Sequence, residues 1–527
     1  MFLSIRDMGK IGLNTELPPY ELKPNAFTRA ENIRFWDGTA QRHPDPADIV
    51  AGGTTWDTQA NPVWLEAWVS KDSTPQFVYA TQTKLYLWDG VGASWNDATN
   101  TADFPTDYTS TSAWGSVTFG DTCVFNNGQD DPQMLEDGDT AFSKLTGWPA
   151  DTKCKVIRKF KNFMVALGVS DSVSGTYYHN KILWSDEAET NSVPQSWDET
   201  DATTLAGSNT ISADDGEIVD GFELGDVFII YTKRAIYEMS FIGAPYVMAF
   251  RKISNNSLLN RNSIAVYDNF HFCVGEREIY IHDGQNIKHI ADQRVRRTFF
   301  DSMVLKDSVK VEASPITKEI FILYNDDTSD NTGPATKALV WCYRYNTFTF
   351  VDMPGVECIK FGYLPGSVTT WDDLQSDATL WSELNITWAQ FSSQDLVPTI
   401  FLLSSADNKI YQSDLFFSSS GSSTAILERK SLDLDGLLSR PTNTVKLIKQ
   451  ILPQITGSGT LTFTLGCHET PDGPVEWLQS QNYIFGDDYT IDLFAVGRYL
   501  AWKITAGAGT QFRLSGMDID VEEVGER

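Results

Sequence analysis

The chain has 527 residues, enough for a large repeat domain together with an accessory domain. Its 70 Asp and Glu against 41 Lys and Arg give a formal net charge of −29, the opposite sign from a protein that grips duplex DNA by neutralising phosphates. No stretch approaches the roughly 18 apolar residues of a membrane span. The opening MFLSIRDMGKIGLN lacks the apolar region that a secretory signal contains, so we do not expect it to be one.

The first 46 residues predict an extended arm followed by a hairpin. Pro18, Pro19 and Pro24 exclude a regular helix across the arm. We expect a strand at Glu31–Trp36, and the Asp-Gly pair that follows it favours a tight turn with positive φ angles. A strand near the start of a chain is expected to pair with a distant element.

A short unit then repeats along the chain, clearest at Lys84–Trp95, KLYLWDGVGASW. Apolar and aromatic residues alternate in it, as in a buried strand, and an Asp-Gly turn ends the run. Weaker copies are found at Met134–Leu145, Ile182–Asp186, Ala235–Met239, Ile279–Ile287, Val340–Phe350 and Ile410–Asp414. The early copies start roughly 45–55 residues apart, which is the spacing of four-stranded propeller blades. The pattern therefore predicts a mainly β protein built around a β-propeller.

About six blades are expected, with five or seven as alternatives. The predicted blades are Asn61–Thr99, Trp114–Leu145, Cys154–Asp186, Gly216–Phe250, Ser263–Ile290 and Val309–Phe350. Thr399–Asp414 is expected to belong to the last blade or to close the ring. The polar stretch between the third blade and Thr210 is interpreted as a solvated loop.

An insert at Ser367–Phe391 interrupts the blades and carries Trp371, Trp381 and Trp388. Their spacing is too irregular for the apolar face of a helix. We favour a structural loop over a recognition patch, because a Trp that is buried locally needs no partner.

A different β-rich region follows the flexible sequence FSSSGSST. Its strands are expected at Val445–Ile455, Thr460–Gly466, Tyr499–Thr505 and Gln511–Val521. The ending LSGMDIDVEEVG is interpreted as an edge strand protected by acidic residues. The predicted division is an N-terminal arm that forms part of a platform (1–55), a propeller (56–425) with the Trp/Asp-rich insert near 367–391, and a C-terminal β platform domain (426–527).

Few residues predict chemistry. The six cysteines are scattered and are expected to be small buried hydrophobes, and the six histidines show no zinc-site spacing. No phosphate-binding loop or nucleophile motif occurs, so we expect no enzyme activity, cofactor or metal. Two basic segments stand out, Lys153–Lys161 and Arg294–Arg297. We favour the interpretation that these basic residues form salt bridges to the many acidic residues of the chain. A more specific hypothesis is that Arg294, Arg296 and Arg297 contact an acidic surface of a neighbouring copy in a ring.

Several segments, in order, resemble one family. They include LPPYEL, NAFTRAENIRF, VIRKFKNFMVAL, ILWSDEAE and VPQSWDET, and two long blocks at Gly216–Phe250 and Asn262–Phe300. This set is similar to the tail nozzle proteins of short-tailed bacteriophages, also called tail-tube B or DNA-stabilisation proteins. Similar Trp-Asp loops occur in that family. The resemblance also implies that both ends of the chain form a platform, with the propeller inserted between them.

The resemblance implies a virion protein that is made in the host cytoplasm and placed in the tail. It implies a homohexameric ring that docks through its platform on the tail adaptor ring below the portal. The sequence leaves open whether a tail fibre, a needle or nothing docks at the tip. It also implies that the ring retains packaged DNA and gates its ejection, with DNA crossing the lumen without specific binding. An acidic channel wall suits that passage, because carboxylates repel phosphates.

Two other functions remain open from the residues. A receptor- or glycan-binding propeller would place exposed aromatics, such as the three tryptophans of the insert, on one rim. A propeller hydrolase would need two carboxylates at a set separation in a cleft, which sequence cannot show.

Overall fold

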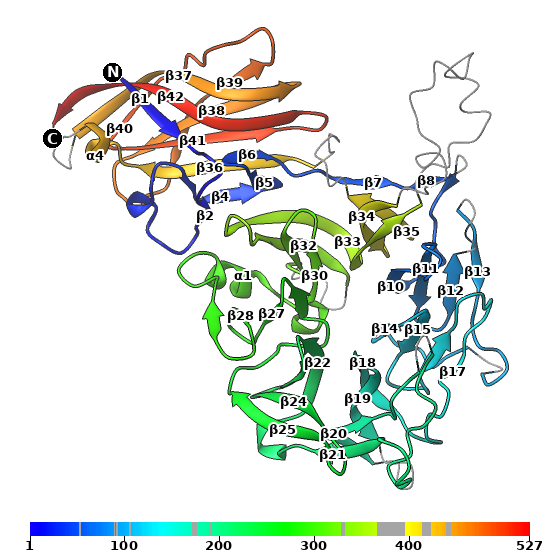
Figure 1. Cartoon of the computed structure of the whole chain (residues 1–527). Helices are drawn as coiled ribbons and strands as arrows, with labels where there is room; N and C mark the ends of the chain where they lie inside the picture. The colour runs from blue at the N-terminus through cyan, green and yellow to red at the C-terminus, as the bar shows by residue number, and fades with distance from the viewer. Residues whose placement is uncertain are drawn as a thin grey trace, which may run out of the picture.

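The computed structural model describes residues 1–51, 54–88, 90, 93–104, 107–170, 176–189, 192–327, 333–365, 396–413, 423–438 and 444–526. The chain is mainly β and forms a β-propeller attached to a β platform that carries both chain ends (Figure 1). The predicted Trp/Asp-rich insert, with Trp371, Trp381 and Trp388, lies outside the described residues.

Five blades are consecutive four-stranded antiparallel meanders, as the repeat predicts. The first contains β10 (Pro62–Val69), β11 (Pro75–Thr81), β12 (Leu85–Trp88) and β13 (Trp95–Asp97), and the second contains β14 (Gly115–Phe119), β15 (Thr122–Asn126), β16 (Gln133–Leu135) and β17 (Ser143–Lys144). The third contains β18 (Cys154–Phe160), β19 (Phe163–Ser170), β20 (Tyr177–Trp184) and β21 (Gly207–Thr210). The fourth contains β22 (Ile218–Leu224), β23 (Val227–Thr232), β24 (Ile236–Gly243) and β25 (Val247–Ser254). The fifth contains β26 (Ile264–Tyr267), β27 (Phe270–Val274), β28 (Ile279–His282) and β29 (Ile287–His289).

The last two blades share one strand. β30 (Lys310–Ser314), β31 (Glu319–Tyr324) and β32 (Ala335–Cys342) pair in order, and β32 pairs with the first half of β33 (Thr347–Leu364). The second half of β33 pairs with β34 (Val397–Ser404), which pairs with β35 (Lys409–Ser413). The outer strand of that blade is β7 (Pro46–Asp48), from near the N-terminus.

The described residues therefore form seven blades, where the sequence favoured six. The repeat does not mark the boundary inside β33, because this strand continues from one blade into the next. Two smaller corrections follow from the same pairings. The polar stretch before Thr210 contains the fourth strand of the third blade, and β7, expected in the platform arm, closes the propeller ring.

The platform has two sheets that pack face to face. One has the order β40 (Ala495–Gly497), β37 (Thr444–Ser458), β42 (Gln511–Glu526), β6 (Thr39–Arg42) and β5 (Ile33–Trp36), with β1 (Phe2–Arg6) also on β42. The other has the order β4 (Arg29–Glu31), β36 (Ala425–Leu432), β41 (Tyr499–Ala506), β38 (Thr460–His468) and β39 (Glu476–Ile484). The Asp37-Gly38 turn between β5 and β6 has positive φ angles of 47° and 72°, as predicted.

The C-terminal strand is not the edge strand that its acidic residues suggested. β42 pairs with β37 on one side and with β1 and β6 on the other. Two of its carboxylates pair with the chain's own start: the amino group of Met1 lies 2.7 Å from Asp520 Oδ1, and Arg6 Nη2 lies 2.9 Å from Asp518 Oδ1. These exposed ion pairs add to the backbone pairing of β1 with β42.

The platform and the propeller share one apolar core. β4 lies beside β33 of the sixth blade and beside β36 of the platform, so a continuous sheet joins the two parts. The same core cluster contains Phe27 and Trp502 of the platform and Phe272 and Trp341 of the fifth and sixth blades. Other elements are β2 (Gly12–Leu13), β3 (Ala26–Phe27), β8 (Val50–Ala51), β9 (Thr54–Thr55), α1 (Arg296–Ser302), α4 (Asp435–Leu438) and the 3-10 turns Pro19–Glu21, Ala213–Asp215 and Lys306–Ser308.

Candidate functional site along the propeller axis

The inner strands of the blades bring a group of charged side chains together on the propeller axis. Arg158 of β18 and Asp220 of β22 form its centre. Arg158 Nε and Nη2 donate to the two carboxylate oxygens of Asp220 at 3.0 and 2.9 Å. The two side chains are 7% and 0% exposed, so neither charge relies on bulk water.

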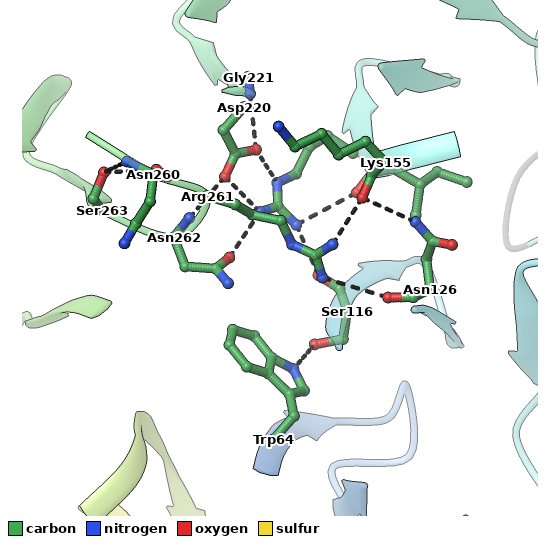
Figure 2. A network of polar contacts seen from close by, with 12 residues as sticks. Trp64, Ser116, Asn126, Lys155, Asp220, Gly221, Asn260, Arg261, Asn262 and Ser263 are labelled. Atoms are coloured by element: carbon green, nitrogen blue, oxygen red, sulfur yellow. Dashed lines mark hydrogen bonds and ion pairs between the residues drawn. The ribbon is translucent and has the colours of Figure 1, made fainter. Parts of the chain in front are cut away.

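This one guanidinium connects four blades. Arg158 Nη1 donates to the carbonyl oxygen of Ser116 in the second blade at 3.2 Å, and Nη2 donates to Asn262 Oδ1 beside the fifth blade at 3.1 Å. The backbone N–H groups of Asn262 and Gly221 in turn donate to Asp220. Figure 2 shows Asp220, Gly221, Asn262 and Ser116 in this arrangement. The network satisfies the buried carboxylate from several sides and fixes how the blades sit around the axis.

A second group joins the first, second, sixth and seventh blades. Trp64 Nε1 donates to Ser116 Oγ at 2.6 Å (Figure 2), and that hydroxyl donates to Glu66. Lys360 Nζ lies 3.3 Å from a Glu66 carboxylate oxygen and 4.0 Å from a Glu312 carboxylate oxygen. The same ammonium lies 4.9 Å from the centre of a Trp64 ring, within cation–π distance.

Burial and charge act in opposite directions on this lysine. Burial disfavours the ammonium form of Lys360, but the nearby Glu66 and Glu312 carboxylates outweigh it and raise the pKa of Lys360. Burial also raises the pKa of the Glu312 carboxyl, and the charge of Lys360 opposes that rise. Lys360 is therefore a permanent cation that neutralises the acidic side of the axis.

The cavity left among these side chains is small. It has a volume of about 210 Å³ and is lined by residues that include Trp64, Arg158, Phe222 and Lys360. That space suits a handful of water molecules, each of which takes about 30 Å³ in the liquid. Duplex DNA, whose major groove alone is about 12 Å wide, cannot pass through it. The axis of a single propeller is thus not a DNA channel.

A wider hollow opens on the face where the inner strands begin. Its volume is about 700 Å³, and it shares Asn262 and Lys310 with the smaller cavity. Its charged lining residues are Lys155, His179, Glu217, Lys233, Arg261, Asp307 and Lys310. The axis therefore has a charged, solvent-accessible mouth above a narrower centre.

The structure separates the arginines that the sequence grouped at Arg294–Arg297. Arg294 is half-buried and donates to the carbonyl oxygens of Asn346 at 2.5 Å and Ile11 at 3.2 Å, so it ties the N-terminal arm to the sixth blade. Arg296 and Arg297 are exposed and pair with Asp292 and Asp301 at 3.1 and 3.3 Å. The other basic segment is also divided, because Arg158 lies on the axis while Lys155 lines the mouth.

Sequence reasoning did not identify the axial pair, although a signal was present. Strand side chains alternate between two faces, so Arg158 shares a face with Val156 and Phe160. Those two residues are fully buried, and a charge in register with them needs a buried partner. Asp220, 62 positions further along the chain, shares a face with Phe222 and Leu224, beyond a bulge that separates it from Ile218.

Neither a metal-binding cluster nor a membrane-spanning helix occurs in the described part of the chain. Within those ranges, no group of three or more His, Cys, Asp or Glu residues is arranged to hold a metal ion. No described helix has both the length and the apolar character to cross a membrane. The six cysteines are free and five are buried, and burial raises the pKa of Cys154 and Cys273 to about 12, which makes these thiols unreactive.

Acid is expected to destabilise the protein through buried histidines. His271 and His282 lie between the fourth and fifth blades, where both bond to the hydroxyl of Tyr231. Burial lowers their pKa values to about 3 and about 4, and burial together with the Arg34 charge lowers that of His43 to about 4. Below about pH 6.5 the unfolded chain binds protons at these histidines, whereas the folded chain does not. The free energy of unfolding therefore falls as the pH is lowered from neutral toward pH 4.

Each such histidine contributes at most about 1.4 kcal/mol per pH unit within that window. Urea unfolding midpoints measured between about pH 7.5 and pH 4.5 check this slope, with His271→Gln as the comparison. The variant is expected to show a shallower fall, because one buried base no longer titrates. A fall as steep as in the wild type would contradict the assignment to His271.

The fold and the axial site together define a β-propeller protein with a platform built from both chain ends. No family model matches the chain, and no curated protein matches it. Among solved structures, the chain is similar to YCF48 from Cyanidioschyzon merolae, with 11% identity, a TM-score of 0.38, and coverage of 68% of this chain and 96% of that one. It is also similar to a chain in a crystal structure of the mitotic checkpoint complex, with 12% identity, a TM-score of 0.39, and coverage of 70% and 93%.

Proposed function

We propose that the chain is a tail nozzle, a structural protein that assembles into a homohexameric ring around the DNA channel of a short-tailed phage tail. The observation that carries the proposal is the insertion of the propeller into the chain of the platform. β1, β5 and β6 complete the sheet of β37 and β42, and the blades lie between them in sequence. This is the arrangement that the family resemblance implies.

The narrow axis supports a channel between copies. Among the described residues, ion pairs and a cavity of about 210 Å³ leave no passage for duplex DNA through one propeller, so DNA would cross a bore enclosed by the ring. The net charge of −29 suits such a bore, because a wall of carboxylates repels phosphates and lets DNA slide. We expect Asp, Glu, Ser, Thr and Asn to line it, and a ring lined by Lys and Arg would contradict the proposal.

The platform offers a surface for assembly. Its segment 476–497 carries several exposed large apolar side chains: Leu478, Ile484, Tyr489, Phe494 and Val496. Tyr489 is 78% exposed and Phe494 is 54% exposed. Exposed apolar side chains gathered on one segment are typical of protein contacts, and we assign this segment to the contact with a neighbouring copy or with the adaptor ring.

Cryo-electron microscopy of the purified protein, alone and mixed with its adaptor ring, tests the proposal. A six-fold ring with an open central bore is the expected result. Monomers in both samples would contradict it, and binding to a glycan array would then favour the receptor-binding alternative. The propeller fold by itself favours that alternative. Fibres or a needle at the tip, and retention of packaged DNA, belong to the nozzle proposal.

Polar substitution of the platform segment is expected to prevent assembly without unfolding the protein. The double variant Tyr489→Ser/Phe494→Ser removes exposed apolar area that contributes about 25 cal/mol per Å² when buried in a contact. Ring formation on the adaptor should fall at least about tenfold, with Tm unchanged. The matched control is Ile242→Ser/Tyr246→Ser on the β24–β25 turn, where Tyr246 is also 78% exposed. Equal assembly by both variants would contradict the assignment of the segment.

A further inference from the structure

The mouth of the propeller axis is positively charged in a strongly acidic protein. Four cations, Lys155, Lys233, Arg261 and Lys310, line it against two carboxylates, Glu217 and Asp307, and Lys310 Nζ also lies 3.9 Å from a carboxylate oxygen of Glu357 outside the lining. They come from the third, fourth, fifth and sixth blades or from the loops that enter them, because each inner strand begins at this face. Figure 2 shows Lys155 and Arg261 side by side next to Asn126.

One carboxylate is shared by several of these groups. Glu217 lies 3.4 Å from Lys155 Nζ, 3.9 Å from Lys233 Nζ and 3.7 Å from His179 Nδ1. Lys233 also donates to the carbonyl oxygen of Leu259 at 3.2 Å. One negative charge faces two ammonium groups here, so the local balance is positive.

Built geometry holds the arginine at this mouth. Arg261 Nη1 donates to the carbonyl oxygen of Lys155 at 2.7 Å, and Nη2 donates to that of Asn126 at 3.4 Å. Gly115 is needed for this position, because a Cβ there would lie 2.2 Å from Arg261 Nη2. The guanidinium is thus fixed before any ligand arrives, which reduces the entropy lost on binding.

Two buried polar atoms at the mouth have no hydrogen-bond partner among the residues that the structure describes. Trp114 Nε1 is a donor on a side chain that is 2% exposed, and Asn260 Oδ1 is an acceptor on a residue that is 7% exposed. Both residues line the hollow, although the two orphaned atoms themselves are covered. Leaving a buried donor or acceptor unsatisfied is costly, so a molecule toward which these side chains turn, and which both accepts and donates hydrogen bonds, would be favoured.

We propose that this mouth binds a small hydroxylated oxyanion of the class of sugar acids and sugar phosphates. The cations and Trp114 Nε1 recognise the carboxylate or phosphate oxygens, and Asn260 Oδ1 accepts a hydrogen bond from a neighbouring hydroxyl. The volume of about 700 Å³ lies within the usual range for small-molecule sites. The site goes beyond the nozzle proposal and does not depend on ring assembly.

Isothermal titration of the full chain at low salt tests the site with glucuronate, glucose 6-phosphate, inorganic phosphate and glucose. The expected result is saturable binding of the first two, weaker binding of phosphate, which lacks the sugar hydroxyls, and none of neutral glucose. Glucuronate without glucose 6-phosphate would identify a carboxylate site, and the reverse a phosphate site. Glucose binding as tight as glucuronate, or no anion binding up to about 10 mM, would overturn the proposal.

Substitutions separate the mouth from general surface charge. Lys233→Met is expected to weaken glucuronate binding at least about tenfold. Trp114→Phe is expected to weaken it several-fold because it removes the indole N–H; the smaller ring also leaves a cavity in the core, so its Tm is measured alongside. Lys71→Met is the matched control, because Lys71 is an exposed lysine paired with Asp121 outside the hollow. Lys233 is more than one-third exposed, so its variant should keep the wild-type Tm. Equal weakening by Lys71→Met and Lys233→Met would show a nonspecific charge effect and overturn the site.

Discussion

Replacing Arg158 with methionine is expected to lower the free energy of unfolding by about 3–5 kcal/mol. The variant keeps a long side chain in place but leaves Asp220 buried with 0% exposure and no cation beside it. The carboxylate would still accept the backbone N–H groups of Gly221 and Asn262, which cannot neutralise its charge. The fall in the urea midpoint, followed by tryptophan fluorescence, measures the effect.

Two comparisons isolate the buried charge as the cause. The double variant Arg158→Met/Asp220→Asn removes both charges and is expected to recover most of the lost stability. Arg296→Met removes an exposed pair with Asp292 and should cost less than about 1 kcal/mol. A double variant as unstable as Arg158→Met would mean that the contacts to Ser116 and Asn262, rather than the charge on Asp220, set the loss.

The sequence predicts the propeller well because each blade is local. Paired strands such as β11 and β12 follow one another in the chain and are connected by a short turn. The alternation of their apolar and polar residues is visible within a few positions. The seventh blade is not local. Its inner strand is the continuation of β33 past Gly355, where φ is +76°, and its outer strand β7 comes from the other end of the propeller sequence. The apolar periodicity of a short stretch of sequence cannot show a pairing between such distant strands.

The same distinction explains the candidate site. The acidic ending of β42 looked like edge protection, yet its partner is β1 at the opposite chain end. The position of Arg158, a charged residue on a buried strand face, indicates that it needs a buried partner. That the partner is Asp220 depends on how the third and fourth blades pack against each other. The basic mouth likewise collects Lys155, Lys233 and Arg261 from three blades. Strand type and register follow from neighbouring residues, whereas charge pairing across blades follows only from the closed ring.

Replacing Arg34 with methionine is expected to weaken the junction between platform and propeller. Arg34 belongs to β5 of the platform and donates from Nε to Glu319 Oε1 of the sixth blade at 2.6 Å, with a second bond to Oε2. Both side chains are only 2% exposed. The variant leaves the Glu319 carboxylate buried without its cation, which should cost about 3–5 kcal/mol.

The location of that loss tests how the two parts are joined. Because the carboxylate can regain water only if the junction opens, hydrogen exchange should rise in 33–42 and 310–324, while the second and third blades stay protected. The matched control is Arg29→Met. It removes a bidentate but exposed pair between Arg29 and Glu31, both of β4, and should cost less than about 1 kcal/mol. Faster exchange spread evenly over all blades would contradict a local junction. It would mean that the shared apolar core makes platform and propeller one cooperative unit, in which a buried charge at any point destabilises the whole chain.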